Sequence, residues 1–366
     1  MYLLFPTPIM LIHTTESNIP PLIPRFLPRL TIILKQYADD PTAIVNLTIK
    51  LLGPVPFEDV FSLAQSDELI VALDSPAPAA NLLGMAILHK AIAAPRFITF
   101  FCTHPDLVAA FIRRWLVAPQ VEVGQKGGKV LGDLLDIDSA QPPPPPPNRP
   151  ADASHTDLSI RRAPGEGTLW NLLFRNQQMY TLLLDLVSGR HPDTLADPHQ
   201  LSLAQGRLLR LLPRLAAIDF PAVSHSDFPA PTPTYLLNGH ANGTMDVDVD
   251  GDGAAHHAPS PLRPPRPGEG LLQYAALRLV QRSDLLMHLS LVDFFEALVA
   301  LMRVTEASDA KLATLRAVVG EAAGGDEVLR EALLTLPDRT VEEEAADLRV
   351  WLREVMPGEE VRMAVR

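Results

Sequence analysis

The chain has little cysteine and no long uninterrupted apolar run. Its one cysteine, Cys102, excludes an intramolecular disulfide and indicates a reducing compartment. Phe100 and Phe101 precede this cysteine, so we interpret its thiol as packed in the core rather than as a nucleophile. The most apolar stretch, residues 285–302, contains His288, Asp293 and Glu296. Because charges are costly inside a bilayer, we interpret this stretch as a buried helix rather than a membrane span.

Positive charge and aromatic residues are also scarce. The net charge is −12, and a protein that binds duplex DNA directly is expected to carry a basic footprint instead. Aromatics make up 6% of the chain, whereas hydrophobic residues, mostly Leu and Ala, make up 47%. This composition predicts an all-α chain with a large core. The apolar N-terminus lacks a basic segment and contains Pro6 and Pro8, so we expect no signal peptide and a cytoplasmic or nuclear protein.

Proline is abundant, and its distribution predicts the domain organisation. Two stretches hold 17 of the 36 prolines and show no apolar period, which is typical of disordered insertions. The predicted parts are N-terminal helical repeats (1–138), a Pro-rich loop (139–168), further helical repeats (169–220), a disordered acidic and Pro-rich loop (221–268), and C-terminal helical repeats with a polar end cap (269–356).

The clearest helical pattern is a pair of amphipathic helices joined by a short turn. The first, 105–117, has an apolar stripe at helical spacing. The second, 119–137, is predicted to bury Val121, Val130, Leu131, Leu134 and Leu135. The other helices are predicted at about 22–38, 41–52, 57–63, 67–73, 79–93, 169–187, 198–218 (with a kink or break at Pro213), 271–281, 284–302, 311–319, 326–336 and 341–355.

A short signal recurs along the chain, in which a small or acidic residue and a proline precede an apolar helix. It occurs at Pro41, Pro76 and Pro119, which are 35 and 43 residues apart. Periods near 40 residues with two helices per unit are typical of helical-repeat arrays. We therefore predict a HEAT/armadillo-like α-solenoid with two Pro-rich disordered insertions; an ordinary helical bundle with proline at its helix starts is the alternative.

The motifs that could carry chemistry are weak. Residues 246–251, DVDVDG, resemble half of a calcium loop, but His257 stands where the bidentate Glu belongs. Residues 124–129, GQKGGK, lack the spacing of a phosphate-binding loop, and their glycines favour close helix packing instead. Asp293 and Glu296 could form an acid pair, although such residues more often lie at a helix edge. We expect no catalytic, cofactor-binding or metal-binding residues, and a helical enzyme is the weakest hypothesis.

Several motifs resemble the filamentous-fungal members of the proteasome base-assembly chaperone family, catalogued as proteasome subunit S-five-B-like. The fungal branch is named for a high-spontaneous-mutagenesis, DNA mismatch repair phenotype. The resemblance covers about residues 22–355. The motifs are SPAPAANLL (75–83), VAAFIRRWL (108–116), VEVGQKGGKVLGDLLDID (121–138), PGEGTLW (164–170), LAQGRLLRLLPRLAAIDF (203–220) and LVDFFEALV (291–299).

The resemblance implies a non-catalytic scaffold or chaperone that binds the C-terminal domain of a proteasomal ATPase subunit during assembly of the regulatory-particle base. The alternative is a helical-repeat adaptor that acts in DNA mismatch repair through protein partners. We expect no cofactor, no direct nucleic-acid or membrane partner, and a monomer when free. Because the second helix of each pair usually lines the concave face of a solenoid, we predict partner contacts at Glu122, Lys126, Lys129, Asp133 and Asp136.

Overall fold

The computed structural model describes residues 42–140, 164–228, 265–266 and 268–358, together with residues 23, 26, 29 and 30. Helices hold 78% of these residues and strands 2%, which confirms the predicted all-α class. The acidic tract at 246–252 and most of both predicted insertions lie outside the described residues. Contacts divide the chain into two compact units, residues 1–140 with 162–170 and residues 141–161 with 171–366.

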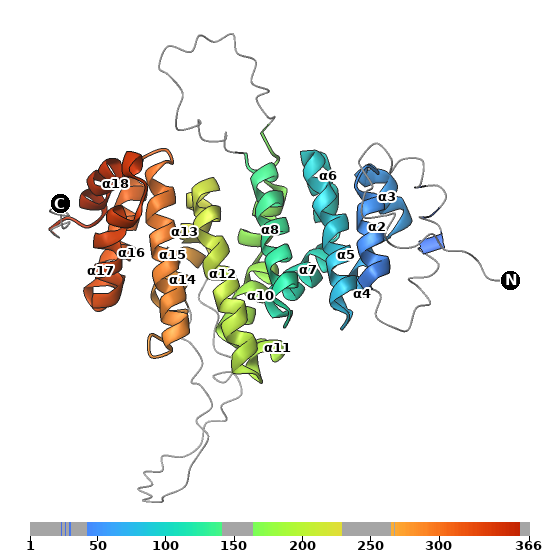
Figure 1. Cartoon of the computed structure of the whole chain (residues 1–366), viewed down its shortest axis with the longest axis horizontal. Coiled ribbons are helices and arrows are strands. Elements are labelled where there is room, and N and C mark those ends of the chain that lie inside the picture. The colour runs from blue at the N-terminus through green and yellow to red at the C-terminus, as the bar shows by residue number, and fades with distance from the viewer. Residues whose placement is uncertain are drawn as a thin grey trace, which may run out of the picture. The chain divides into compact units, whose positions relative to one another are not determined.

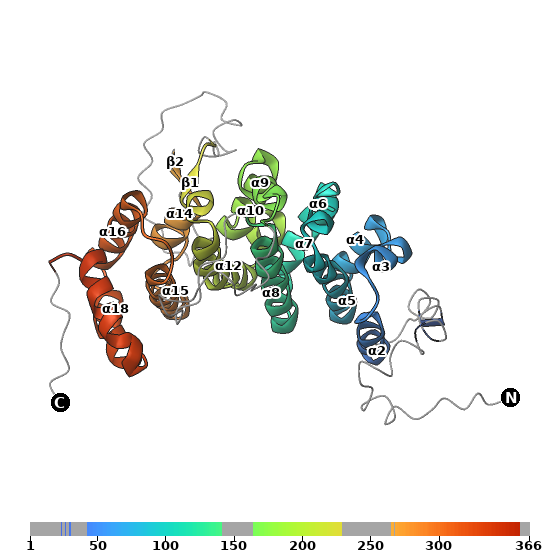
Figure 2. The ribbon, with the colours of Figure 1, turned by 90° about the horizontal axis from the view of Figure 1, so that it is seen from above.

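The first unit runs from blue to green in Figure 1. Its elements are α2 (Thr42–Leu52), α3 (Phe57–Leu63), α4 (Ser66–Asp74), α5 (Pro78–His89), η3 (Lys90–Ala93), α6 (Pro95–Cys102), α7 (Pro105–Val117), α8 (Val121–Asp138) and the start of α9 (Thr168–Phe174). The helices form two layers (Figure 2): α2, α5 and α8 lie side by side in one, and α4 lies beside α7 in the other.

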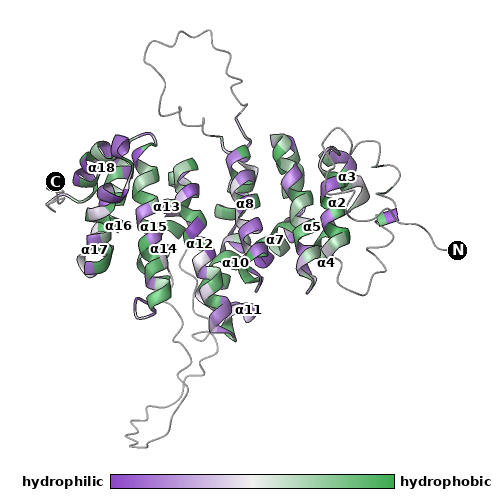
Figure 3. Ribbon diagram, in the orientation of Figure 1, coloured by the Kyte–Doolittle hydropathy of each residue, from purple (hydrophilic) through white to green (hydrophobic). Residues whose placement is uncertain are grey.

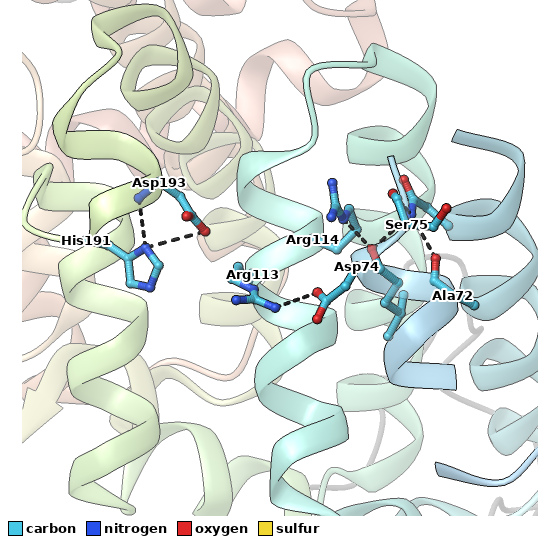
Figure 4. A network of polar contacts seen from close by, with 9 residues as sticks. Ala72, Asp74, Ser75, Arg113, Arg114, His191 and Asp193 are labelled. Atoms are coloured by element: carbon cyan, nitrogen blue, oxygen red, sulfur yellow. Dashed lines mark hydrogen bonds and ion pairs between the residues drawn. The ribbon is translucent and has the colours of Figure 1, made fainter. Parts of the chain in front are cut away.

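Polar side chains hold the end of α4 against its neighbours (Figure 4). The buried side-chain amide of Asn81 donates to the carbonyls of Ala72, Leu73 and Ser75, each at 2.9 Å. From α7, Arg113 pairs with Asp74 at 2.5 Å, and Arg114 donates to the Leu73 carbonyl. The bonds from Asn81 and Arg114 satisfy carbonyls that a helix leaves without partners at its C-terminus.

The predicted amphipathic pair is confirmed in outline. The first helix has the predicted bounds, and its whole apolar stripe is buried. The second begins at Val121 rather than Pro119, and Val121 is 62% exposed instead of buried. Val121 lies one turn before the exposed Gln125, so its side chain points away from the core. The other four predicted core residues, Val130, Leu131, Leu134 and Leu135, are buried.

The glycines of α8 allow a close helix contact, as predicted. A Cβ atom at Gly127 would lie only 2.9 Å from Cβ and from Cδ1 of Trp115 on α7. Trp115 is 2% exposed, so its ring has little room to move. A glycine at this position therefore sets how closely α7 and α8 approach.

The chain leaves and re-enters the first unit at one place. Gly165 N–H donates to the Ser139 carbonyl and Gly167 N–H to the Asp138 carbonyl, both at 2.8 Å. The backbones lie so close that a Cβ atom at Gly165 would be 2.2 Å from the carbonyl carbon of Asp138. Because its two ends are joined in this way, a long insertion can leave the packing of α8 unchanged.

The second unit runs from green to red in Figure 1. Its elements are the rest of α9, α10 (Gln177–Ser188), α11 (Pro192–Leu195), α12 (Pro198–Ile218), α13 (Phe220–Ser224), β1 (His225–Ser226), β2 (Gly268–Glu269), α14 (Leu271–Leu277), α15 (Leu285–Arg303), α16 (Asp309–Gly324), α17 (Glu327–Thr335), η5 (Leu336–Arg339) and α18 (Glu342–Val355). α12 packs along α15 and also contacts α13 and α14, and Figure 2 shows α12, α14 and α15 next to one another.

Four predicted helices of this unit differ from the structure. Two differ in length, since α14 ends at Leu277 rather than at 281 and α16 covers Asp309–Gly324 rather than 311–319. The other two differ in continuity. The segment 169–187 is divided into α9 and α10, because the Asn176 side chain accepts a hydrogen bond from Met179 N–H at 3.0 Å and caps a new helix. α12 does not break at Pro213, which lies buried inside it. Leucines on both sides of Pro213 are buried, and this packing outweighs the hydrogen bond that proline removes.

Ordered structure extends into the second predicted insertion. α13 and β1 together cover Phe220–Ser226, so residues 221–226 are ordered where the composition predicts no structure. The side chain of Asp219 caps α13, accepting from Ala222 N–H at 3.0 Å. β1 then pairs antiparallel with β2, with His225 opposite Glu269. The ends of the second insertion, like those of the first, are thus joined by backbone contacts.

Among the described helices, α15 is long and apolar enough to span a membrane by length and composition alone. Figure 3 shows it as largely apolar. Eight of its 19 residues are buried inside the second unit, including Phe294, Phe295 and Leu298. A core helix of a soluble protein shows the same features, so they do not indicate a membrane span.

Candidate partner-binding site

The predicted contact residues share one side of α8. Helical spacing places all five on a single stripe opposite the buried leucines, and the described structure agrees. Glu122, Lys129 and Asp136 are exposed, whereas Lys126 and Asp133 are half-buried. The stripe therefore combines a solvent-facing part with a more enclosed polar part.

The enclosed part is a cluster that includes a residue the sequence did not predict. His89, the last residue of α5, places Nε2 2.8 Å from Oδ2 of Asp133. The same carboxylate oxygen accepts from Lys129 Nζ at 2.9 Å. Lys126 Nζ lies 3.5 Å from Nδ1 of His89. Four side chains from two neighbouring helices, His89, Lys126, Lys129 and Asp133, thus form what we call the α5–α8 cluster.

Burial decides the charge of this cluster. It lowers the pKa of His89 below 6.5, and the positive charge of Lys126 also lowers it. The hydrogen bond to Asp133 raises the pKa, but the net shift is downward. Burial also lowers the pKa of Lys126, aided by the charge of Lys129. At pH 7 His89 is therefore neutral, its Nε2–H donates to Asp133, and its Nδ1 accepts from Lys126.

This arrangement leaves the imidazole with no free nitrogen. A general base needs an unoccupied lone pair within reach of the proton it removes. In the cluster, Lys126 faces the only lone pair of the neutral ring. Cys102, the chain's one thiol, is equally unsuited to nucleophilic chemistry, since burial and the charge of Asp138 raise its pKa to about 12. Neither His89 nor Cys102 is therefore arranged for acid–base or nucleophilic chemistry.

A second polar site, also not predicted, caps α9. Asp138 is fully buried and accepts hydrogen bonds from Leu169 N–H at 2.7 Å, Trp170 N–H at 3.3 Å and the Thr168 hydroxyl at 3.2 Å. Burial raises the pKa of Asp138 despite these bonds. The motifs VLGDLLDID and PGEGTLW contain the two halves of this contact, but the insertion separates them in the sequence. Its role is structural.

The acidic pair considered on α15 also has a structural explanation. Arg339 pairs with Glu296 at 2.6 Å, and Asp293 lies exposed nearby.

At the start of the same helix, His288 Nε2 lies 2.7 Å from Oδ2 of Asp326. The other carboxylate oxygen of Asp326 accepts from Leu329 N–H and caps α17. Within the described ranges, no group of three His, Cys, Asp or Glu residues could hold a metal ion.

Comparison with protein-family models, with curated proteins and with solved structures finds no significant match for this chain.

Proposed function

We propose that this protein is a non-catalytic scaffold or chaperone. In this proposal it binds the C-terminal domain of a proteasomal ATPase subunit during assembly of the regulatory-particle base. The resemblance of its sequence motifs to the proteasome base-assembly chaperone family motivates the choice of partner. The observation that carries the scaffold role is the division of α8 into a fully packed side and a charged, outward side. Such a helix presents charges to a partner while its core side maintains the fold.

The layered packing of the first unit supports an α-solenoid architecture within the same proposal. The pairs α4–α5 and α7–α8 follow each other in sequence, and their second helices, α5 and α8, lie side by side. In helical-repeat arrays, equivalent helices of successive repeats form one continuous face that binds partners. The α5–α8 cluster joins the two helices on that face, and His89 and Asp133 hold its charges in fixed positions.

Exposure indicates which charged side chains of α8 a partner reaches most easily. Asp133 already pairs with His89 and Lys129, and its side chain is 18% exposed. The exposed residues Glu122, Lys129 and Asp136 are the better candidates for direct contact. Alternating charges of this kind fix the register of a complex and its association rate more than its affinity.

Purified C-terminal domains of the proteasomal ATPase subunits, titrated against the full chain, test this proposal. We expect one domain to bind, and the variant with Glu122→Lys, Lys129→Glu and Asp136→Lys to bind it more weakly. The changes at Glu122 and Asp136 should each alter the free energy of unfolding by no more than about 0.5 kcal/mol. Lys129→Glu also removes the pair with Asp133 and puts two carboxylates four residues apart on the helix, so the stability of the variant is measured beside its binding. Asp67→Lys, exposed on α4, changes the net charge equally and should leave binding intact. Equal binding by both variants would place the contact elsewhere.

A further inference from the structure

A groove lies between α14 and α16, two helices of the second unit that contact each other (Figure 2). Its volume is about 430 Å³, and small-molecule sites span about 300–1,000 Å³. The apolar part of its wall consists of Leu277, Ala313, Ala317 and Val318. Ala313 and Ala317 are exposed and have short side chains, so the groove is open to solvent along α16. We call it the α14–α16 groove.

The uncharged polar side chains of the groove use donors in contacts elsewhere. Gln273 donates from Nε2 to the Ser224 carbonyl at 2.6 Å, and the Thr314 hydroxyl donates to the Ala310 carbonyl at 2.9 Å. Gln273 Oε1 is buried and accepts no hydrogen bond from the described part of the chain. The Thr314 oxygen retains lone pairs that can accept. The hydrogen-bonding capacity left in the groove is therefore mainly that of acceptors.

The two carboxylates of the groove differ in what they already bind. Glu269 pairs with both Arg266 and Arg278. Glu321 is exposed, and within the ranges that the structure describes it has neither a hydrogen bond nor an ion pair. The charge of Glu321 is therefore the one available to a ligand. Thr314 lies seven positions before it on α16, about 10 Å along the helix axis, so the groove is longer than a single cationic group.

We propose that the α14–α16 groove binds an arginine side chain of a partner protein. The guanidinium group would pair with Glu321, and its methylene stem would lie on Leu277 and Ala317. A guanidinium has five donors and no acceptor, so it complements a groove whose remaining polar groups accept. Long cationic side chains commonly bury their stems on apolar surface while the charged end stays polar. Arginine suits the site better than lysine, because its planar group donates two parallel hydrogen bonds to one carboxylate.

This inference goes beyond the proposed role of α8 and does not depend on it. It uses residues of the second unit only, and it specifies the partner by the chemistry of one side chain. The two proposals can fail independently, since one is tested with proteasomal ATPase domains and the other with amino-acid derivatives.

The test compares the binding of Nα-acetyl-arginine amide and Nα-acetyl-lysine amide to the full chain, by saturation-transfer NMR titration. The two ligands carry the same charge, so non-specific attraction to a chain of net charge −12 contributes equally to both. For a ligand of this size we expect the arginine derivative to bind with a Kd on the order of 1 mM. The lysine derivative should bind more weakly by roughly threefold or more.

Variants locate the interaction. Glu321→Gln removes the available carboxylate and should weaken the arginine derivative roughly tenfold, with loss of its advantage over lysine. Ala317→Leu fills the groove and should weaken both ligands. Asp309→Asn, exposed in the first turn of the same helix, removes the same charge outside the groove and should change neither. All three positions are exposed, and thermal melts check that each variant keeps its fold.

Three outcomes would each overturn the proposal. The first is equal affinity for the two derivatives, or no binding of the arginine derivative at tens of millimolar, on the order of ten times the expected Kd. The second is an arginine affinity that a folded Glu321→Gln variant retains. The third is an equal loss of affinity in Glu321→Gln and Asp309→Asn, which would assign the attraction to net charge rather than to the groove.

Discussion

The contact between Gly127 and Trp115 offers a quantitative test of how α7 and α8 pack. Replacing Gly127 with Ala adds one methyl group to the interior of α8. Glycine costs about 0.5–1 kcal/mol relative to alanine inside a helix, so on propensity alone the substitution should stabilise the protein. The structure predicts otherwise, since the added atom would lie 2.9 Å from Cβ of Trp115, an atom that moves only with the α7 backbone.

The expected cost comes from overpacking. Forcing an extra methyl group into a packed core typically costs about 1–3 kcal/mol. Gly128→Ala is the matched control, because it makes the same chemical change at the next position of the same helix. Its Cβ would meet only the far end of the ring, Nε1 of Trp115, at 3.3 Å. Because helix propensity contributes equally to both, Gly127→Ala should be less stable than Gly128→Ala by roughly 1–3 kcal/mol.

Urea unfolding, followed by the fluorescence of the buried Trp115, measures this difference. Trp351 lies in the second unit, so Trp351→Phe in every variant makes the signal report the first unit, which also contains Trp170. Equal midpoints for the two variants, or a more stable Gly127→Ala, would refute the packing argument. Such a result would mean that α7 and α8 are farther apart than described.

Two further predictions concern the buried polar groups of the first unit. The folded state lowers the pKa of His89 below 6.5, so the unfolded chain binds more protons at this residue. The free energy of unfolding should therefore fall as the pH drops below about 6.5. In thermal melts recorded across this pH range, His89→Gln should lose this part of the dependence of stability on pH. A slope that His89→Gln retains in full would assign it to other groups. Asp138→Ala leaves the N–H groups of Leu169 and Trp170 buried without an acceptor and should cost about 1–3 kcal/mol, whereas Asp138→Asn keeps one acceptor and should cost less. An Asp138→Ala variant as stable as the wild type in urea would contradict the capping role.

Local patterns predicted the helices well where apolar spacing and proline agreed. The helix 105–117 has a continuous stripe and a proline in its first turn, and both bounds are confirmed. The start of α8 was harder to predict, since Pro119 suits the first turn of a helix but the helix begins two residues later, at Val121. The break between α9 and α10 depends on one capping bond of Asn176, a signal that a strong apolar period obscures.

The contacts that join distant parts of the chain could not be predicted from local patterns. His89 and Asp133 are 44 positions apart, and their meeting depends on how α5 lies against α8. The strands β1 and β2 are two residues long and lie on either side of an insertion, so propensity carries no information about their pairing. The stripe on α8 was predictable because helical periodicity alone determines which residues share a side.

In our proposal, the outward side of α8 contacts a proteasomal ATPase subunit. Hydrogen exchange of the full chain, measured with and without the purified ATPase C-terminal domain that it binds, tests this most directly. We expect slower exchange at the backbone amides of Val121–Asp138 and at the end of α5 near His89, with no comparable change in α4. Binding of the domain with unchanged exchange throughout α8 and α5 would contradict the claim.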